Sequence, residues 1–142
     1  MNNCLKICPS LQSNENSQQT SQENITLMQI KVAEVEKSIK LLKEINSDIR
    51  KCYEDSLLAL GLEKKTLQCD LTDKMDNMWK YIKKTHAEIV ELRDYEVVGE
   101  TALENKMRRN MVSMCFRKFS NEVTTFQQFQ VDYKARQIDA VK

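Results

Sequence analysis

The sequence predicts an all-helical protein, folded as an elongated antiparallel up-down-up bundle of three helices with left-handed packing. Of its 142 residues only two are glycine and one is proline, too few for the turns of a strand-rich protein. Lys, Glu, Leu, Met and Gln, which favour helix, are abundant. Apolar residues recur at steps of three and four along three long segments, and the two glycines, Gly61 and Gly99, separate these segments.

The first helix is predicted over about residues 24–58, after a polar stretch. Residues 1–22 are rich in Ser, Asn, Gln and Thr, so we predict a disordered N-terminal tail and place the bundle at residues 23–142. Gly61 is the expected C-terminal stop of this helix. Polar Asn46 interrupts the apolar repeat, whose members we expect in the core are Val35, Ile39, Leu42 and Ile49.

The second helix is predicted over about residues 64–96, with Gly99 at the next junction. Trp79 stands one step from the apolar repeat. We interpret it as packing at the edge of the core, with an exposed interaction anchor as the alternative, because tryptophan is favoured at binding hot spots. The expected core residues of this helix are Met78, Ile82, Ile89 and Leu92.

The third helix is predicted over about residues 101–140 and has the most regular repeat. It opens at Thr101-Ala-Leu-Glu104, which matches a capping box. Gln130 is a polar member of the repeat, and it either sets the register of the bundle or contacts an additional helix. The expected core residues are Met107, Met111, Cys115, Phe119, Val123, Phe126 and Tyr133.

No pattern in the sequence indicates catalysis. His86 is the single histidine and has no cysteine or carboxylate set at metal-ligand spacing around it. Phosphate-binding loops and nucleophile motifs are absent from the sequence. The five cysteines, which fit a reducing compartment, are scattered: Cys4, Cys8, Cys52, Cys69 and Cys115. We therefore expect a non-enzymatic protein with no catalytic residues, no cofactor and no metal.

The charge balance gives no general reason to expect nucleic acid as a partner, since 22 basic and 21 acidic residues leave a formal net charge of +1. No stretch approaches the ~20 apolar residues that cross a bilayer, and the N-terminus lacks a secretory layout. We expect a soluble, cytosolic monomer. A basic run on the third helix is either a solvated face or a docking surface, and the candidate partner-binding residues of this helix are Arg108, Arg109, Arg117, Lys118, Gln130, Lys134 and Arg136.

The third helix also carries a pattern of known type. Its members are, in order, Arg117, Lys118, Phe119, Phe126, Gln130, Asp132, Tyr133, Lys134 and Arg136. This pattern resembles the third helix of the N-terminal Habc regulatory domain of syntaxins, the t-SNARE family, and of the plasma-membrane-type members in particular. The resemblance covers about residues 25–142; it is strong in the third helix and mostly at the level of pattern in the first two.

The resemblance implies a regulatory module of vesicle docking and membrane fusion. Such a domain binds its own or a cognate SNARE helix, in a groove between the second and third helices, and is recognised by an SM-family protein. The full-length protein would sit on the cytoplasmic face of a membrane through a C-terminal anchor. This sequence lacks that anchor and the SNARE motif, so we expect a fragment or a truncated product. Two departures are Cys115, where the family usually has a larger aliphatic residue, and a tail without the SM-binding peptide.

Two alternatives remain open. The first is a spectrin-like structural or scaffold module, which tandem copies of the same unit in the full-length gene would favour. The second is a peripheral membrane binder that uses the basic face of the third helix, and its attraction to lipid should vanish as salt rises.

Overall fold

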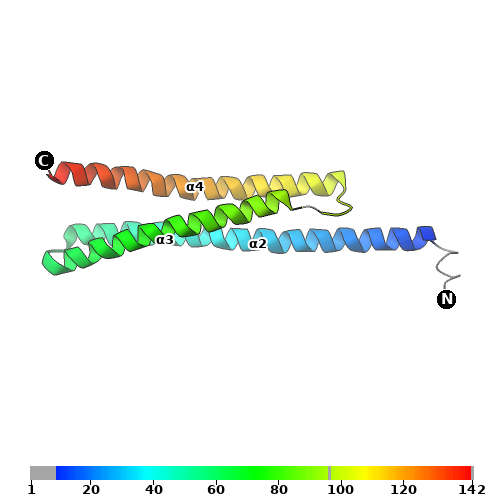
Figure 1. Cartoon of the computed structure of the whole chain (residues 1–142), viewed down its shortest axis with the longest axis horizontal. Helices are drawn as coiled ribbons and strands as arrows, with labels where there is room; N and C mark the ends of the chain where they lie inside the picture. Colours follow the sequence, from blue (N-terminus) through cyan, green and yellow to red (C-terminus); the bar gives the residue numbers. More distant parts are fainter. Residues whose placement is uncertain (1–8, 96, 142) are drawn as a thin grey trace.

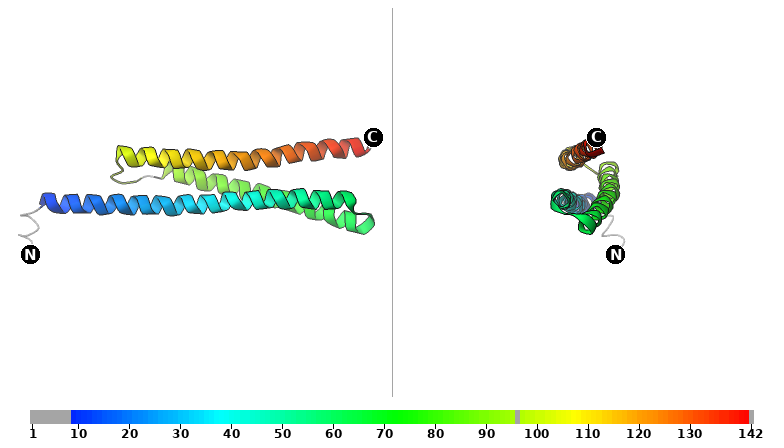
Figure 2. Two further views of the ribbon diagram at one scale, coloured as in Figure 1. Left: turned by 180° about the vertical axis from the view of Figure 1, so that it is seen from behind. Right: turned by 90° about the vertical axis from the view of Figure 1, so that its left-hand side faces the viewer.

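Three long helices make up the part of the chain that this computed structural model describes, residues 9–95 and 97–141. They are α2 (Pro9–Leu58), α3 (Gly61–Asp94) and α4 (Ala102–Val141). The helices lie side by side and alternate in direction, so the molecule is an elongated rod (Figure 1, Figure 2). The α2–α3 turn and the last turns of α4 lie at one end, and the α3–α4 connection lies toward the other (Figure 1). The predicted all-helical three-helix bundle is confirmed.

α2 begins earlier than we predicted. We expected a helix from about residue 24 after a disordered tail, but helical backbone already starts at Pro9. Proline is well tolerated in the first turn of a helix, where its missing N–H would have no partner in any case. Residues 10–23 contain no glycine and no further proline, and extending a helix is much easier than nucleating one. Residues 1–8, the rest of the predicted tail, lie outside the described residues.

One apolar core runs along the rod and is built by all three helices. Most predicted core residues are buried there, namely Val35, Ile39, Leu42, Ile49, Met78, Ile82, Ile89, Leu92, Cys115, Phe119 and Phe126. Val123 and Tyr133 are half-buried against its edge. Met107 and Met111 are also only half-buried, whereas we predicted both in the core. Near the α3–α4 connection α4 extends past the end of α3, so the first turns of α4 have fewer neighbours (Figure 1).

Partly buried polar contacts tie α2 to the other helices. The Ser38 hydroxyl donates to the Glu88 carboxylate of α3 at 2.8 Å. The Asn46 amide donates to Glu122 of α4, to its carboxylate at 2.9 Å and to its backbone carbonyl at 3.1 Å. Sliding a helix along its axis would break these bonds and leave partly buried polar groups unpaired. They therefore help to fix the register of the three helices.

The α2–α3 turn depends on the backbone conformation of Gly61. Its φ is +63°, in the left-handed region that L side chains disfavour. A Cβ at this position would meet nothing within 4 Å, so conformation rather than crowding requires the glycine. Leu60 occupies the N-cap position of α3 and supplies no capping side chain. We predicted Gly61 as the stop of the first helix; it is the first residue of the next one.

The α3–α4 connection contains the second left-handed glycine, Gly99, with a φ of +75°. The capping box that follows is formed as predicted. The Thr101 hydroxyl accepts the backbone N–H of Glu104 at 3.1 Å, and the Glu104 carboxylate accepts the N–H of Thr101 at 3.4 Å. Together the two glycines mark the junctions of the bundle, as the sequence indicated, and α3 and α4 begin and end within a few residues of the predicted bounds.

Candidate functional site

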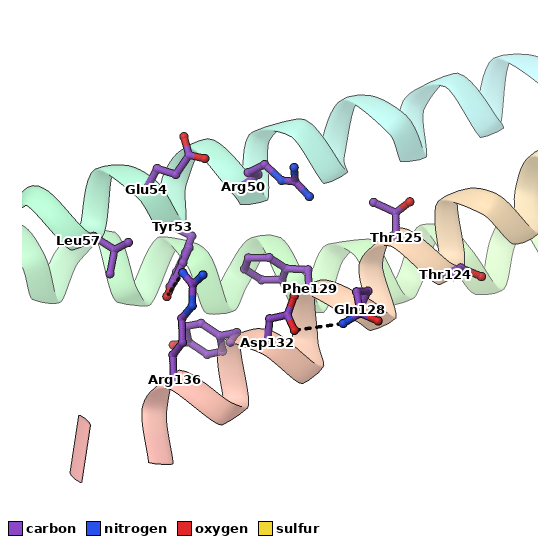
Figure 3. A pocket seen from close by; sticks show the side chains of 11 residues that line it. Arg50, Tyr53, Glu54, Leu57, Thr124, Thr125, Gln128, Phe129, Asp132 and Arg136 are labelled. Carbon is purple, nitrogen blue, oxygen red and sulfur yellow. Dashed lines mark hydrogen bonds between the residues drawn. The ribbon is translucent and has the colours of Figure 1, made fainter. Parts of the chain in front are cut away.

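A groove lies between α2 and α4, near the α2–α3 turn (Figure 3). We call it the α2–α4 groove. It has a volume of about 550 Å³. Its apolar lining is Tyr53 and Leu57 of α2 with Phe129 and Tyr133 of α4, and its charged rim is Arg50, Glu54, Asp132 and Arg136. An aromatic floor between charged edges can receive the apolar face of an amphipathic helix.

The three aromatic rings of the groove form one packed cluster. Tyr53 meets the rings of Phe129 and Tyr133 edge-on, each with centroids 5.6 Å apart and planes at 82°. Phe129 and Tyr133 stand four residues apart on one face of α4, and their rings stack with centroids 5.9 Å apart. Edge-on and offset arrangements of this kind are favourable for aromatic pairs. The three rings therefore pack on one another without a partner.

Arg136 holds the rim of the groove to its floor. Its guanidinium donates to the Tyr53 hydroxyl at 3.1 Å and lies over the Tyr53 ring, 5.5 Å from the centroid. The hydrogen bond to Tyr53 raises the pKa of Arg136, so Arg136 stays positively charged. On the same edge, the Gln128 amide donates to the Asp132 carboxylate at 3.1 Å, a bond drawn in Figure 3. Both signs of charge thus line the α4 side.

A second aromatic surface lies between α3 and α4, the pair of helices that the resemblance implies for SNARE binding. Trp79 meets the buried Phe126 ring edge-on, with centroids 5.2 Å apart, and remains 37% exposed. This position fits the edge-of-core interpretation and also leaves part of the indole in solvent. Phe116 is 49% exposed and contacts Phe119, as His86 does. We call Trp79, His86 and Phe116 the α3–α4 face.

Arg108 does not lie on the exposed outer face where we predicted it. Its guanidinium pairs with the Glu100 carboxylate at 2.9 Å and 3.2 Å and donates to the Arg93 carbonyl. The Arg108 and Glu100 side chains are only 12% and 11% exposed. The hydrogen bond between them lowers the pKa of Glu100 and raises that of Arg108. Arg108 therefore joins α4 to the last turn of α3 and to the connection between the two helices.

The other predicted partner-binding residues do not share one face. Lys118 turns toward α2 and pairs with Glu36 at 3.3 Å, whereas Arg136 lies on the groove. Arg109, Arg117 and Lys134 are exposed, and Gln130 is half-buried. Binding was not predicted for Tyr53 and Phe129. The spacing of Phe129 and Tyr133 was visible, but which helix would meet them depends on how α2 packs.

The buried cysteines of the described residues belong to the core. Cys52 and Cys115 are buried, and burial raises the pKa of both thiols, as expected for small core residues. Across residues 9–95 and 97–141 no cluster of three or more His, Cys, Asp or Glu side chains could hold a metal ion. Within the same ranges no helix combines the length and the apolar character needed to span a membrane.

Comparison with known proteins returned no match, whether to a family model, to a curated protein or to a solved structure.

Proposed function

We propose that this chain is a non-enzymatic regulatory module of the syntaxin type, acting in vesicle docking and membrane fusion. In this role it binds an amphipathic SNARE helix, its own or a cognate one, and an SM-family protein. The three-helix fold and the α4 pattern that ends at Tyr133 and Arg136 support the proposal. A helix held on the bundle is withheld from the fusion complex, so regulation follows from competition for that helix.

The observation that carries the proposal is the packed aromatic floor of the α2–α4 groove. Tyr53, Phe129 and Tyr133 offer tyrosine and phenylalanine rings beside the arginine of the rim, and Tyr and Arg are enriched at binding hot spots. We place the helix here rather than on the α3–α4 face, because the groove combines a hollow with charges of both signs. Such charges select the orientation of a bound helix more than they raise its affinity.

The test titrates the native chain into the labelled SNARE-motif helix and measures binding by fluorescence anisotropy in vesicle-free buffer. Leu57→Ser changes a groove side chain that is 56% exposed and should weaken binding about tenfold. Phe116→Ser changes a 49% exposed side chain of the α3–α4 face and serves as the matched control, with affinity unchanged. Circular dichroism checks that both variants fold.

The outcomes separate the alternatives. If Phe116→Ser loses binding and Leu57→Ser does not, the helix binds the α3–α4 face, as the resemblance implies. If neither the SNARE helix nor an SM-family protein binds at high micromolar concentration, the regulatory function is wrong and the spectrin-like scaffold is favoured.

A further inference from the structure

The α2–α3 turn carries leucines that folding leaves in solvent. Leu58, Leu60 and Leu62 are 87%, 84% and 81% exposed. We call these three side chains the leucine tip. Single exposed leucines are common on protein surfaces, whereas three within five residues of one turn concentrate apolar surface that a binding partner would explain. None of the three leucines belongs to the apolar core or packs against it, so the packing of the bundle does not account for them.

The shape and composition of the tip fit a lipid surface better than a protein. The tip occupies the narrow end of a rod (Figure 1). Specific protein interfaces bury about 800 Å² on each partner and depend on Trp, Tyr and Arg, with leucine under-represented among hot spots. Residues 57–67 contain no aromatic side chain and no arginine. A bilayer needs no complementary shape and rewards the burial of each leucine.

We propose that the leucine tip inserts into the interfacial region of a lipid bilayer and anchors this end of the rod to a membrane surface. The first amide groups of α3 lie at the same point, and Leu60 gives them no side-chain cap. Lipid phosphate and ester oxygens can accept from such amides, and the helix dipole favours anionic groups there. This inference goes beyond the proposed helix-binding function and does not depend on it.

The charges around the tip predict how the anchor responds to salt. Lys64 and Lys65 follow the leucines on α3 and can reach lipid phosphates. Asp55 and Glu63 line a hollow beside Leu58 and Leu60, where they oppose an anionic surface. The two signs offset each other, so insertion should depend little on anionic lipid or on ionic strength. This behaviour distinguishes the tip from attraction through the basic residues of α4, which salt would screen.

The experiment is flotation of the full chain with phosphatidylcholine vesicles, with and without phosphatidylserine, at low and high salt. The native chain should float with both vesicle types at both salt concentrations. Leu58→Ser/Leu60→Ser/Leu62→Ser should lower vesicle affinity by at least about a hundredfold. Leu103→Ser is the control, since Leu103 is 69% exposed at the other end of the rod, and it should bind like the native chain.

A second measurement reports where the tip sits. Leu60→Trp in a Trp79→Phe background puts a single tryptophan on the tip, and its emission should shift to shorter wavelength when phosphatidylcholine vesicles are added. An unshifted emission, a native chain that does not float, or equal loss in the Leu103→Ser control overturns the proposal. So does sedimentation velocity without vesicles that shows self-association lost in the triple variant, because the tip would then join copies of the protein.

Discussion

The two ends of the rod turn the chain with similar backbone conformations but leave very different surfaces. Gly61 and Gly99 both adopt a left-handed φ, +63° and +75°. At the α3–α4 end Val98 and Leu103 are also exposed, but the polar groups bond to one another, through the capping box and the Arg108–Glu100 pair. At the α2–α3 end the leucine tip stays in solvent, and the α2–α4 groove opens beside it.

This difference favours the α2–α3 end as the place where the proposed partners bind. Polar side chains at the α3–α4 end bond to one another within the connection, so folding explains their presence. Exposed leucines contribute little to the stability of the isolated bundle, so a partner or a lipid surface is the better explanation for them. We therefore propose that binding occurs at the α2–α3 end.

The core that joins the two ends should give the largest effect on stability. Phe119 is 6% exposed, and Phe119→Ala removes most of a buried ring and leaves a cavity. The free energy of unfolding should fall by about 3–5 kcal/mol in a urea melt, enough to threaten a domain of ordinary stability. A change near zero would show that Phe119 does not face the core.

At the α3–α4 end, Arg108→Ala should be the most destabilising substitution. It removes the Arg108 donor from the Arg93 carbonyl and from the mostly buried Glu100 carboxylate, which keeps only the longer bond from Asn105. The loss costs about 2 kcal/mol of unfolding free energy. Arg109→Ala, at the exposed neighbouring position, is the matched control and should stay within about 0.5 kcal/mol of the native chain. Equal effects of the two substitutions in urea melts would contradict the structural role of Arg108.

The glycines should make the two ends alike in one respect. Gly61→Ala and Gly99→Ala each place a Cβ in a left-handed conformation, and neither Cβ would meet an atom within 4 Å. Each substitution should therefore cost about 1 kcal/mol, from conformation alone. Thermal melts of the two variants test this. A loss at one turn several times that at the other would mean that packing, not backbone conformation, limits one of them.

The smallest expected effect is a dependence of stability on pH at the α3–α4 end. Arg108 lowers the pKa of Glu100 in the folded chain below its unfolded value. The stabilisation is therefore present above the ordinary glutamate pKa, about 4.3, and is lost as pH falls through the lowered folded value. In urea melts across this range, Glu100→Gln should lose stability less steeply than the native chain on acidification. Parallel curves would show that Glu100 is not coupled to Arg108.

Local features of the fold were predictable from the sequence, whereas features that depend on packing between helices were not. Gly61, Gly99 and the Thr101–Glu104 box act within a few residues, so their chemistry was visible in the chain. Periodicity identified most of the core because each helix must bury one face. The start of α2 at Pro9 was missed because composition alone does not limit how far a formed helix extends.

The candidate site shows the same limit. Tyr53 is far from Phe129 and Tyr133 in sequence, and only the packing of α2 on α4 brings the three rings together. Arg108 was assigned to an outer face because its helix suggested one, whereas the conformation of the connection brings Glu100 within reach of it. Both outcomes depend on contacts between separate elements, which spacing within one helix does not specify.

The central claim, that binding occurs at the α2–α3 end, is tested most directly by NMR. Amide chemical shifts of the ¹⁵N-labelled chain would be followed while the unlabelled SNARE-motif helix is added. The account predicts shifts concentrated in residues 50–57 of α2 and 124–136 of α4, the two sides of the groove. Shifts concentrated in residues 97–108, or none at saturating helix, would contradict it.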